Sequence, residues 1–284
     1  FDLSLTLVAI LPFAFFIAYG VMSIPSGILI EKYGEKKVMI LAFMIAFSGA
    51  LLFAVFPQYI VAVLSLFFIG SGMAMLQVAI NPLLRVSGGE ENFAFNSVMA
   101  QLFFGLASFL SPLVYSYLVL NIGTDDMGIF LSVISELVPE DLPWISLYLI
   151  FALVSIIMVI VISISKFPEV LKNEDEKVGA LETHLEMLKN KKVILFFLGI
   201  FAYVGAEQGV ANWISEFLSS YHGYDPQTTG ATTVSWFWGM MTAGTVLGLF
   251  LLKVMDSKKI LVAFTSMVLI CLATALFASG EVAL

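Results

Sequence analysis

The sequence predicts an all-α polytopic membrane protein. Three observations lead to this prediction: the composition, a series of eight long apolar stretches, and the position of the basic residues between them. Hydrophobic residues make up 60% of the chain and charged residues 12%, and the mean hydropathy is +1.02. Soluble domains contain about 45–50% apolar residues. Most of this chain is therefore expected to lie in lipid.

Each apolar stretch is long enough to cross a bilayer, which takes about 20 mostly apolar residues per helix. The Lys and Arg residues follow only the first, third, fifth and seventh stretches, and basic residues are retained on the cytoplasmic side. Consecutive helices are therefore expected to cross the membrane in opposite directions, starting outside. The eight stretches cover residues 4–30, 38–56, 59–84, 95–120, 144–166, 193–216, 230–252 and 260–279.

The loop over residues 121–143 is expected outside the membrane, because it contains no Lys or Arg and holds five carboxylates: Asp125, Asp126, Glu136, Glu140 and Asp141. No basic face suggests nucleic-acid binding. Cys271 is the only cysteine, so the sequence predicts neither an internal disulfide nor a cysteine metal site. The first stretch has no basic leader and is too long for a signal peptide. The expected partners are the lipid bilayer and a small molecule.

The longest cationic gap, residues 167–192, is interpreted as a cytoplasmic linker between two halves, residues 1–166 and 193–284. The end of the first span, from Gly27 to Lys37, is echoed at the end of the seventh, from Gly248 to Lys259. Parallel repeats of this kind occur in two-half transporters. The six-span separation predicts twelve helices in all. On this interpretation the chain is a fragment that holds helices 2–9 and lacks helix 1 and helices 10–12.

The end of the first span also carries a known signature. Its run Gly27-x-x-x-Glu31-Lys32-x-Gly34-x-Lys36-Lys37 resembles the loop between helices 2 and 3 of the major facilitator superfamily, with Glu in place of the usual Asp. The resemblance implies a conformational lock in which the Glu31 carboxylate pairs with the lysines across helix ends. Gly27 would allow close helix approach, and Gly34 a sharp turn.

Three further segments resemble the fucose/glucose–galactose sugar symporters of that superfamily. They are Gly72 to Pro82, which ends in Asn-Pro, Asn96 to Gly105, and Tyr203-Val204-Gly205-Ala206-Glu207. The resemblance covers essentially the whole chain. It implies a major facilitator fold, a location in the bacterial inner membrane, and sugar transport without a cofactor other than a coupling ion, H⁺ or Na⁺.

Glu207 is the main candidate for chemistry. It lies near the middle of the stretch 193–216, where a carboxylate costs about 2.5–3.5 kcal/mol on insertion scales, so it should face a cavity or the bundle interior. We expect it to bind sugar hydroxyls or the coupling ion. The alternative is a protonated acid bonded to a neighbouring helix.

Gln208 and Asn212 are four residues apart and share a helix face with Ser215, next to Trp213. Amides donate and accept hydrogen bonds, which suits a sugar, and an indole can stack on its apolar face. Gln208, Asn212 and Trp213 are therefore candidate substrate-binding residues. The alternative for the amides is hydrogen bonding between helices, and for Trp213 ordinary packing.

Three more amides on earlier spans are candidate substrate-binding residues: Gln77, Asn81 and Gln101. In the proton-coupled fucose permease that this chain resembles, a Glu stands at the position of Gln77 and is implicated in proton coupling. The Gln77 amide cannot titrate. This departure weakens the case for proton coupling there and leaves two alternatives open, sodium coupling and an acid at another position. Asn81 precedes Pro82, which frees a carbonyl one turn earlier, so Asn81 can also have a structural role.

Two expectations concern the stretch 230–252. Trp236, Trp238 and Thr242 are expected to face different sides, with at most one of them in a cavity. Gly244-x-x-x-Gly248 is interpreted as a motif for close helix packing within the chain and not for dimerisation. We expect a monomer.

Together these features predict a secondary transporter that imports a hexose or deoxyhexose by cation symport. An anion carrier would need Lys or Arg inside the spans, and none is present there. An intramembrane enzyme is not supported, because the only histidines, His184 and His222, lie in predicted loops and no metal or nucleophile motif occurs. Two alternatives stay open: a carrier of another neutral polar solute, and a non-transporting sugar sensor.

Overall fold

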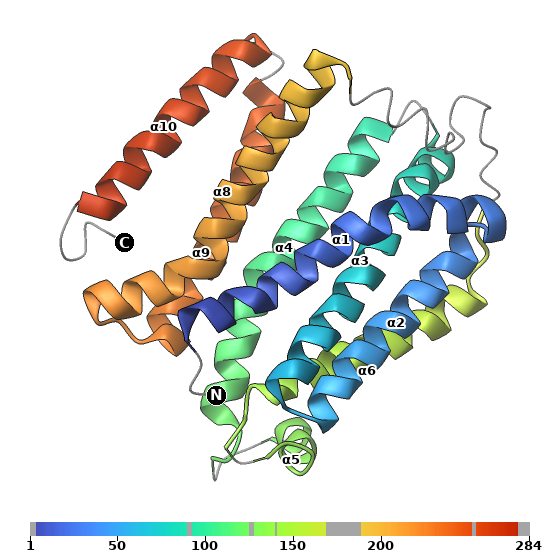
Figure 1. Ribbon diagram of the computed structural model, residues 1–284, viewed down its shortest axis with the longest axis vertical. Helices are drawn as coiled ribbons and strands as arrows, with labels where there is room; N and C mark the ends of the chain where they lie inside the picture. Colours follow the sequence, from blue (N-terminus) through green and yellow to red (C-terminus); the bar gives the residue numbers. More distant parts are fainter. Residues whose placement is uncertain are drawn as a thin grey trace. The chain divides into compact units, whose positions relative to one another are not determined.

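The computed structural model describes residues 4–89, 93–124, 128–139, 141–168, 189–251 and 254–277, and these ranges contain helices and no strand. The elements, labelled in Figure 1, are α1 (Leu5–Tyr33), α2 (Glu35–Val55), α3 (Tyr59–Gly88), α4 (Phe93–Asn121), α5 (Ile129–Ser135), α6 (Ile145–Ile164), α8 (Lys191–His222), the π-turn η3 (Pro226–Gly230), α9 (Ala231–Leu251) and α10 (Ser257–Phe277).

All eight predicted stretches are helical. Among the described residues, seven helices are long and apolar enough to cross a membrane: α1, α2, α3, α4, α6, α8 and α10. Helix α9 occupies the remaining predicted stretch and contains no Asp, Glu, Lys or Arg in its 21 residues. The predicted outer loop 121–143 contains one additional short helix, α5. Of the residues singled out earlier, Asp125, Asp126, Glu140 and His184 lie outside the described ranges.

The described chain divides into two compact units. The first contains residues 1–97 and 118–202, and the second contains residues 98–117 and 203–284, so the middle of α4 belongs with α8, α9 and α10. The predicted division into residues 1–166, 167–192 and 193–284 stays a prediction.

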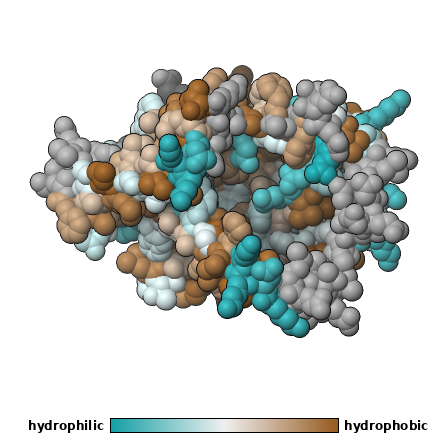
Figure 2. All heavy atoms as spheres, turned by 90° about the horizontal axis from the view of Figure 1, so that it is seen from above, coloured by the Kyte–Doolittle hydropathy of each residue, from teal (hydrophilic) through white to brown (hydrophobic). Residues whose placement is uncertain are grey.

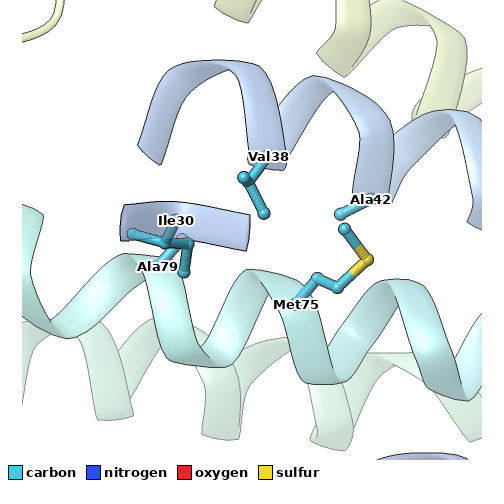
Figure 3. Packing of buried hydrophobic residues seen from close by; sticks show 5 residues of the cluster. All are labelled: Ile30, Val38, Ala42, Met75 and Ala79. Carbon is cyan, nitrogen blue, oxygen red and sulfur yellow. The ribbon is translucent and has the colours of Figure 1, made fainter. Parts of the chain in front are cut away.

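The first unit is built around α3, which packs against both α1 and α2, while α2 also packs against α6 (Figure 1). Its core near the ends of α1 and α3 consists of Ile30, Val38, Ala42, Met75 and Ala79. In Figure 3 the side chain of Met75 points from α3 toward Ala42 on α2. The small alanines leave room for the long Met side chain, so three helices approach closely.

Glycines on α3 permit this approach. A Cβ added at Gly70 would lie 2.4 Å from the main-chain oxygen of Phe15 on α1, and one at Gly72 would lie 2.5 Å from that of Ala42 on α2. These distances are too short for any side chain. The backbones of α1 and α2 therefore contact α3 directly, as is typical of helices that pack in lipid through small residues.

Large hydrophobic side chains cover much of the surface. Phe103 on α4 is 68% exposed, Phe196 on α8 is 74% exposed and Ile270 on α10 is 67% exposed. Seen from above, hydrophilic side chains project between hydrophobic ones (Figure 2). A soluble protein would not expose so many large apolar groups, whereas lipid solvates them.

Candidate functional site

The polar residues of α8 form a hydrogen-bonded group around Glu207. Gln208 donates from Nε2 to Glu207 Oε1 over 3.1 Å, and the side chain of Tyr203 also hydrogen-bonds to Glu207. Tyr203 lies one helical turn before Glu207, so the two side chains meet on one face. Glu207 itself is half-buried. The acid therefore has two polar partners within an otherwise apolar helix.

Asn212 is bonded to its own helix. Its Nδ2 donates to the main-chain oxygen of Gln208 over 2.7 Å, which leaves its exposed amide oxygen as an acceptor. Trp213 is half-buried beside it. Gln208 and Asn212 lie on the same face of α8, as predicted. The hydrogen bond between them joins the Asn212 side chain to the Gln208 main chain.

The C-terminal end of α8 is joined to η3. Ser215 Oγ donates to the main-chain oxygen of Pro226 over 3.4 Å, and a Cβ at Gly230 would lie 2.2 Å from Ser215 Oγ. The Asp225 carboxylate accepts from the backbone N–H groups of Gln227 and Thr228 over 2.8 and 2.9 Å. This side-chain cap fixes the start of η3, as is usual for Asp at the N-cap.

Helices α4 and α9 are in close contact in the second unit. A Cβ at Gly105 would lie 1.9 Å from Thr242 Oγ1, and one at Gly239 would lie 2.8 Å from the Phe109 ring. The rings of Phe104 and Trp238 are 6.3 Å apart in an edge-on arrangement. Gln101, one turn before Gly105, has an exposed side chain.

These contacts correct two expectations. Trp238 and Thr242 do not face different sides, because both pack against α4, and Thr242 Oγ1 donates to the main-chain oxygen of Trp238 over 2.8 Å. The close packing predicted at Gly244 and Gly248 is absent from the described part of the chain, where nothing lies within 4 Å of a Cβ at either position. Gly105 and Gly239 form the close contacts instead.

Gln77 and Asn81 lie on α3 in the first unit. Both side chains are exposed, and α3 continues through Pro82 to Gly88. The adjacent positions Ala74, Met75 and Ala79 are buried in the core of that unit. Gln77 and Asn81 therefore lie on the side of α3 opposite to this core.

The segment predicted as a lock forms the turn between α1 and α2. Gly34 has φ of +81°, a conformation that favours glycine, and Gly27 is buried, as both predicted roles require. Lys36 Nζ donates to the main-chain oxygens of Ser163 and Ser165 over 2.9 and 2.8 Å, at the end of α6. The sequence did not predict this contact. Glu31, Lys32 and Lys37 are exposed, and the pairing of Glu31 with the lysines stays a prediction.

The described residues contain no group of three or more His, Cys, Asp or Glu side chains placed to hold a metal ion. Around Glu207 the partners are a phenol and an amide, which exchange hydrogen bonds with a carboxyl group. Such an arrangement can bind hydroxyl groups.

Sequence reasoning missed two features of the second unit. Tyr203 was noted only as part of a family motif, although its spacing of four residues from Glu207 signals a contact. The four threonines between Thr228 and Thr233, at the start of the predicted stretch 230–252, were not predicted to form a site. The contact between Phe109 and Gly239 has no signal in a single sequence.

Seven helices of membrane-spanning length and a hydrogen-bonded acid within one of them define a multi-pass membrane protein with a polar site. The model of the Major Facilitator Superfamily matches residues 1–283. The chain therefore belongs to the Major Facilitator Superfamily.

Several known proteins are similar over the whole chain. A glucose/galactose transporter of Brucella abortus is 30% identical over 299 residues, which cover 100% of this chain and 67% of the relative. The L-fucose-proton symporter of Escherichia coli is 26% identical, covering 95% of this chain and 65% of the relative. A crystal structure of a variant of the Escherichia coli fucose:proton symporter matches with a TM-score of 0.67 and 22% identity, over 98% of this chain and 71% of that one. The last match confirms the fold.

Proposed function

We propose that this protein is a secondary active transporter of the bacterial inner membrane that imports a neutral hexose or deoxyhexose by cation symport. The similarity to a glucose/galactose transporter extends over the full chain, and the similarity to an L-fucose-proton symporter over 95% of it. The fold and the seven apolar helices fit transport by alternating access, in which the two halves expose a central site to each side in turn.

The observation that supports this proposal most directly is the hydrogen-bonded carboxylate of Glu207 on α8. Glu207 would be costly in a lipid-embedded helix without partners, and Tyr203 and Gln208 supply them. A polyol can replace these hydrogen bonds one for one, because each sugar hydroxyl both donates and accepts. The spans lack interior Lys and Arg, which favours a neutral substrate over an anion.

The coupling ion is proposed to bind at Glu207, as H⁺ or Na⁺. Gln208, Asn212 and Trp213 on α8, Gln101 on α4, and Gln77 and Asn81 on α3 are proposed to contact the sugar. Glu207 is then the only acid among the proposed site residues, so sugar binding and ion binding would meet at its carboxyl group.

Uptake of radiolabelled sugar into proteoliposomes of the complete protein tests this function. Uptake should be accelerated at least tenfold by an inward gradient of either Na⁺ or H⁺, and the effective gradient identifies the ion. An uptake rate that neither the Na⁺ nor the H⁺ gradient changes would contradict symport. A protein that binds sugar but shows no counterflow in preloaded vesicles would be a sensor instead of a transporter.

A further inference from the structure

We propose that a hydroxyl-lined cavity at the start of α9 is a second carbohydrate subsite, separate from Glu207, which holds the sugar on the external side. This inference rests on the proposed function as a sugar transporter. By the charge pattern, the connection between α8 and α9 lies outside the membrane, and the cavity includes residues of this connection and of the start of α9. Its five lining residues are Thr228, Thr229, Thr232, Thr233 and Trp236.

The size and lining of the cavity suit a small polyol. Its volume is about 450 Å³, within the range of about 300–1,000 Å³ that small-molecule sites occupy. The lining carries four hydroxyl groups and an indole, and no charged side chain. An anionic ligand would find no cation there, so the lining selects a neutral ligand that both donates and accepts hydrogen bonds.

Two of the four hydroxyls are available to a ligand. Those of Thr229 and Thr232 have no hydrogen-bond partner among the described residues. The other two are held by the protein: Thr228 Oγ1 donates to Asp225 Oδ1 over 3.1 Å, and Thr233 Oγ1 donates to the main-chain oxygen of Thr229 over 2.8 Å. Held hydroxyls still accept hydrogen bonds through their lone pairs. The cavity thus offers both donors and acceptors at fixed positions.

Trp236 provides an exposed aromatic surface on the same side of α9. Its side chain is 59% exposed, and Phe109 packs against it with ring centroids 5.9 Å apart and an interplanar angle of 74°. The Phe109 ring also packs against Gly239, where a larger residue would clash with the ring. The indole is therefore supported from α4 and can stack on the apolar face of a sugar ring, with its N–H as a donor.

The polar face of α8 leads to this cavity. Ser215 contacts both Pro226 and Gly230 of η3, and η3 carries Thr228 and Thr229. Ser215 lies eight residues after Glu207, or about 12 Å along the helix axis at 1.5 Å per residue. A sugar held at the cavity would thus be about two helical turns outward of the acid.

Kinetic measurements on the reconstituted complete protein test the subsite, with galactose as the probe. Thr232→Val and Trp236→Leu should each raise the KM of uptake about fivefold, the effect of losing a contact worth about 1 kcal/mol, while kcat changes less than twofold. Thr232→Ser, which keeps the hydroxyl, should retain the wild-type KM. Thr245→Val is the matched control, because Thr245 lies on α9 outside the cavity and bonds to its own helix.

A second measurement does not depend on turnover. In a Cys271→Ser background, Thr232→Cys should react with a membrane-impermeant thiol reagent added outside, and galactose should slow the reaction at least threefold. This protection should persist in the Glu207→Gln variant, whose uptake is reduced, because the cavity does not include Glu207.

The outcomes separate the two proposals. Wild-type protein that transports galactose, with an unchanged KM in both cavity variants and no protection of Thr232→Cys, would overturn the subsite and leave the transporter intact. Wild-type protein that neither binds nor transports any sugar would overturn the proposed function itself.

Discussion

The Lys36 ammonium group lies 2.8 Å from the main-chain oxygen of Ser165, directly after the last residue of α6. Carbonyl groups at the end of a helix have no partner within the helix and carry a partial negative charge. Lys36 also donates to the oxygen of Ser163. The start of α2 is thereby tied to the end of α6 by a lysine of the family signature.

Replacing Lys36 by Met should remove both hydrogen bonds while keeping the apolar part of the side chain. We expect a loss of about 1 kcal/mol in stability, because the contact is partly exposed to solvent. Thermal unfolding in detergent measures this loss. Lys37→Met is the control, since Lys37 is exposed at the next position; equal effects of the two variants would exclude a specific role for Lys36.

Replacing Glu207 by Gln should reduce ion-coupled uptake at least tenfold and leave the amount of protein in the membrane nearly unchanged. The amide keeps the size of the side chain but cannot carry the charge. Initial uptake rates and quantitative blots of the same membranes measure the two effects. Glu216→Gln, on the same helix, should leave uptake unaltered. Parallel losses of uptake and abundance for Glu207→Gln would indicate a folding role.

Removing the hydroxyl of Tyr203 with Tyr203→Phe should weaken uptake about tenfold. A hydrogen bond to a charged group contributes about 1.5–3 kcal/mol, and each 1.4 kcal/mol corresponds to a factor of about ten. The comparison of kcat/KM in proteoliposomes checks this effect. Tyr221→Phe is a suitable control, because Tyr221 is exposed near the end of α8. A wild-type value for Tyr203→Phe would show that Glu207 does not depend on this contact.

Placing a carboxyl group at Gln77 with Gln77→Glu should make uptake more dependent on pH, provided that this position can host a coupling proton. The glutamate would then titrate, whereas the native amide does not. Initial rates between about pH 5 and 8 would reveal the change, because glutamates whose pKa is raised by burial titrate in this range. Gln101→Glu provides a comparison on α4. An unaltered pH profile for Gln77→Glu would count against a coupling role for α3.

Adding one methyl group at Gly70 should destabilise the first unit. A Cβ there would lie 2.4 Å from the main-chain oxygen of Phe15, so Gly70→Ala forces α1 and α3 apart at a cost of about 1–3 kcal/mol. The melting temperature in detergent should fall accordingly. Gly20→Ala, which meets nothing within 4 Å on α1, should be neutral or slightly stabilising. An unchanged melting temperature for Gly70→Ala would contradict direct backbone packing.

The predictions that succeeded from sequence rest on local chemistry. The helices appeared where apolar runs met the length of a bilayer, and Gly34 formed the turn that its missing side chain allows. The predictions that failed concern which helix a residue faces. The motif Gly244-x-x-x-Gly248 has the right spacing for packing, yet the close contacts lie at Gly105 and Gly239. A spacing defines a helix face and does not identify the neighbour that covers it.

By itself, the sequence determined that this chain crosses a membrane repeatedly and that an acid at position 207 must find polar partners, while the direction in which its helices cross stays a prediction. These properties follow from transfer free energies and charge, which act on each segment separately. The tertiary structure alone decided that Lys36 caps α6, that Phe109 supports Trp236, and that four threonines line one cavity. The first two contacts join residues distant in the chain and depend on how whole helices pack, whereas the cavity depends on how η3 leads into α9.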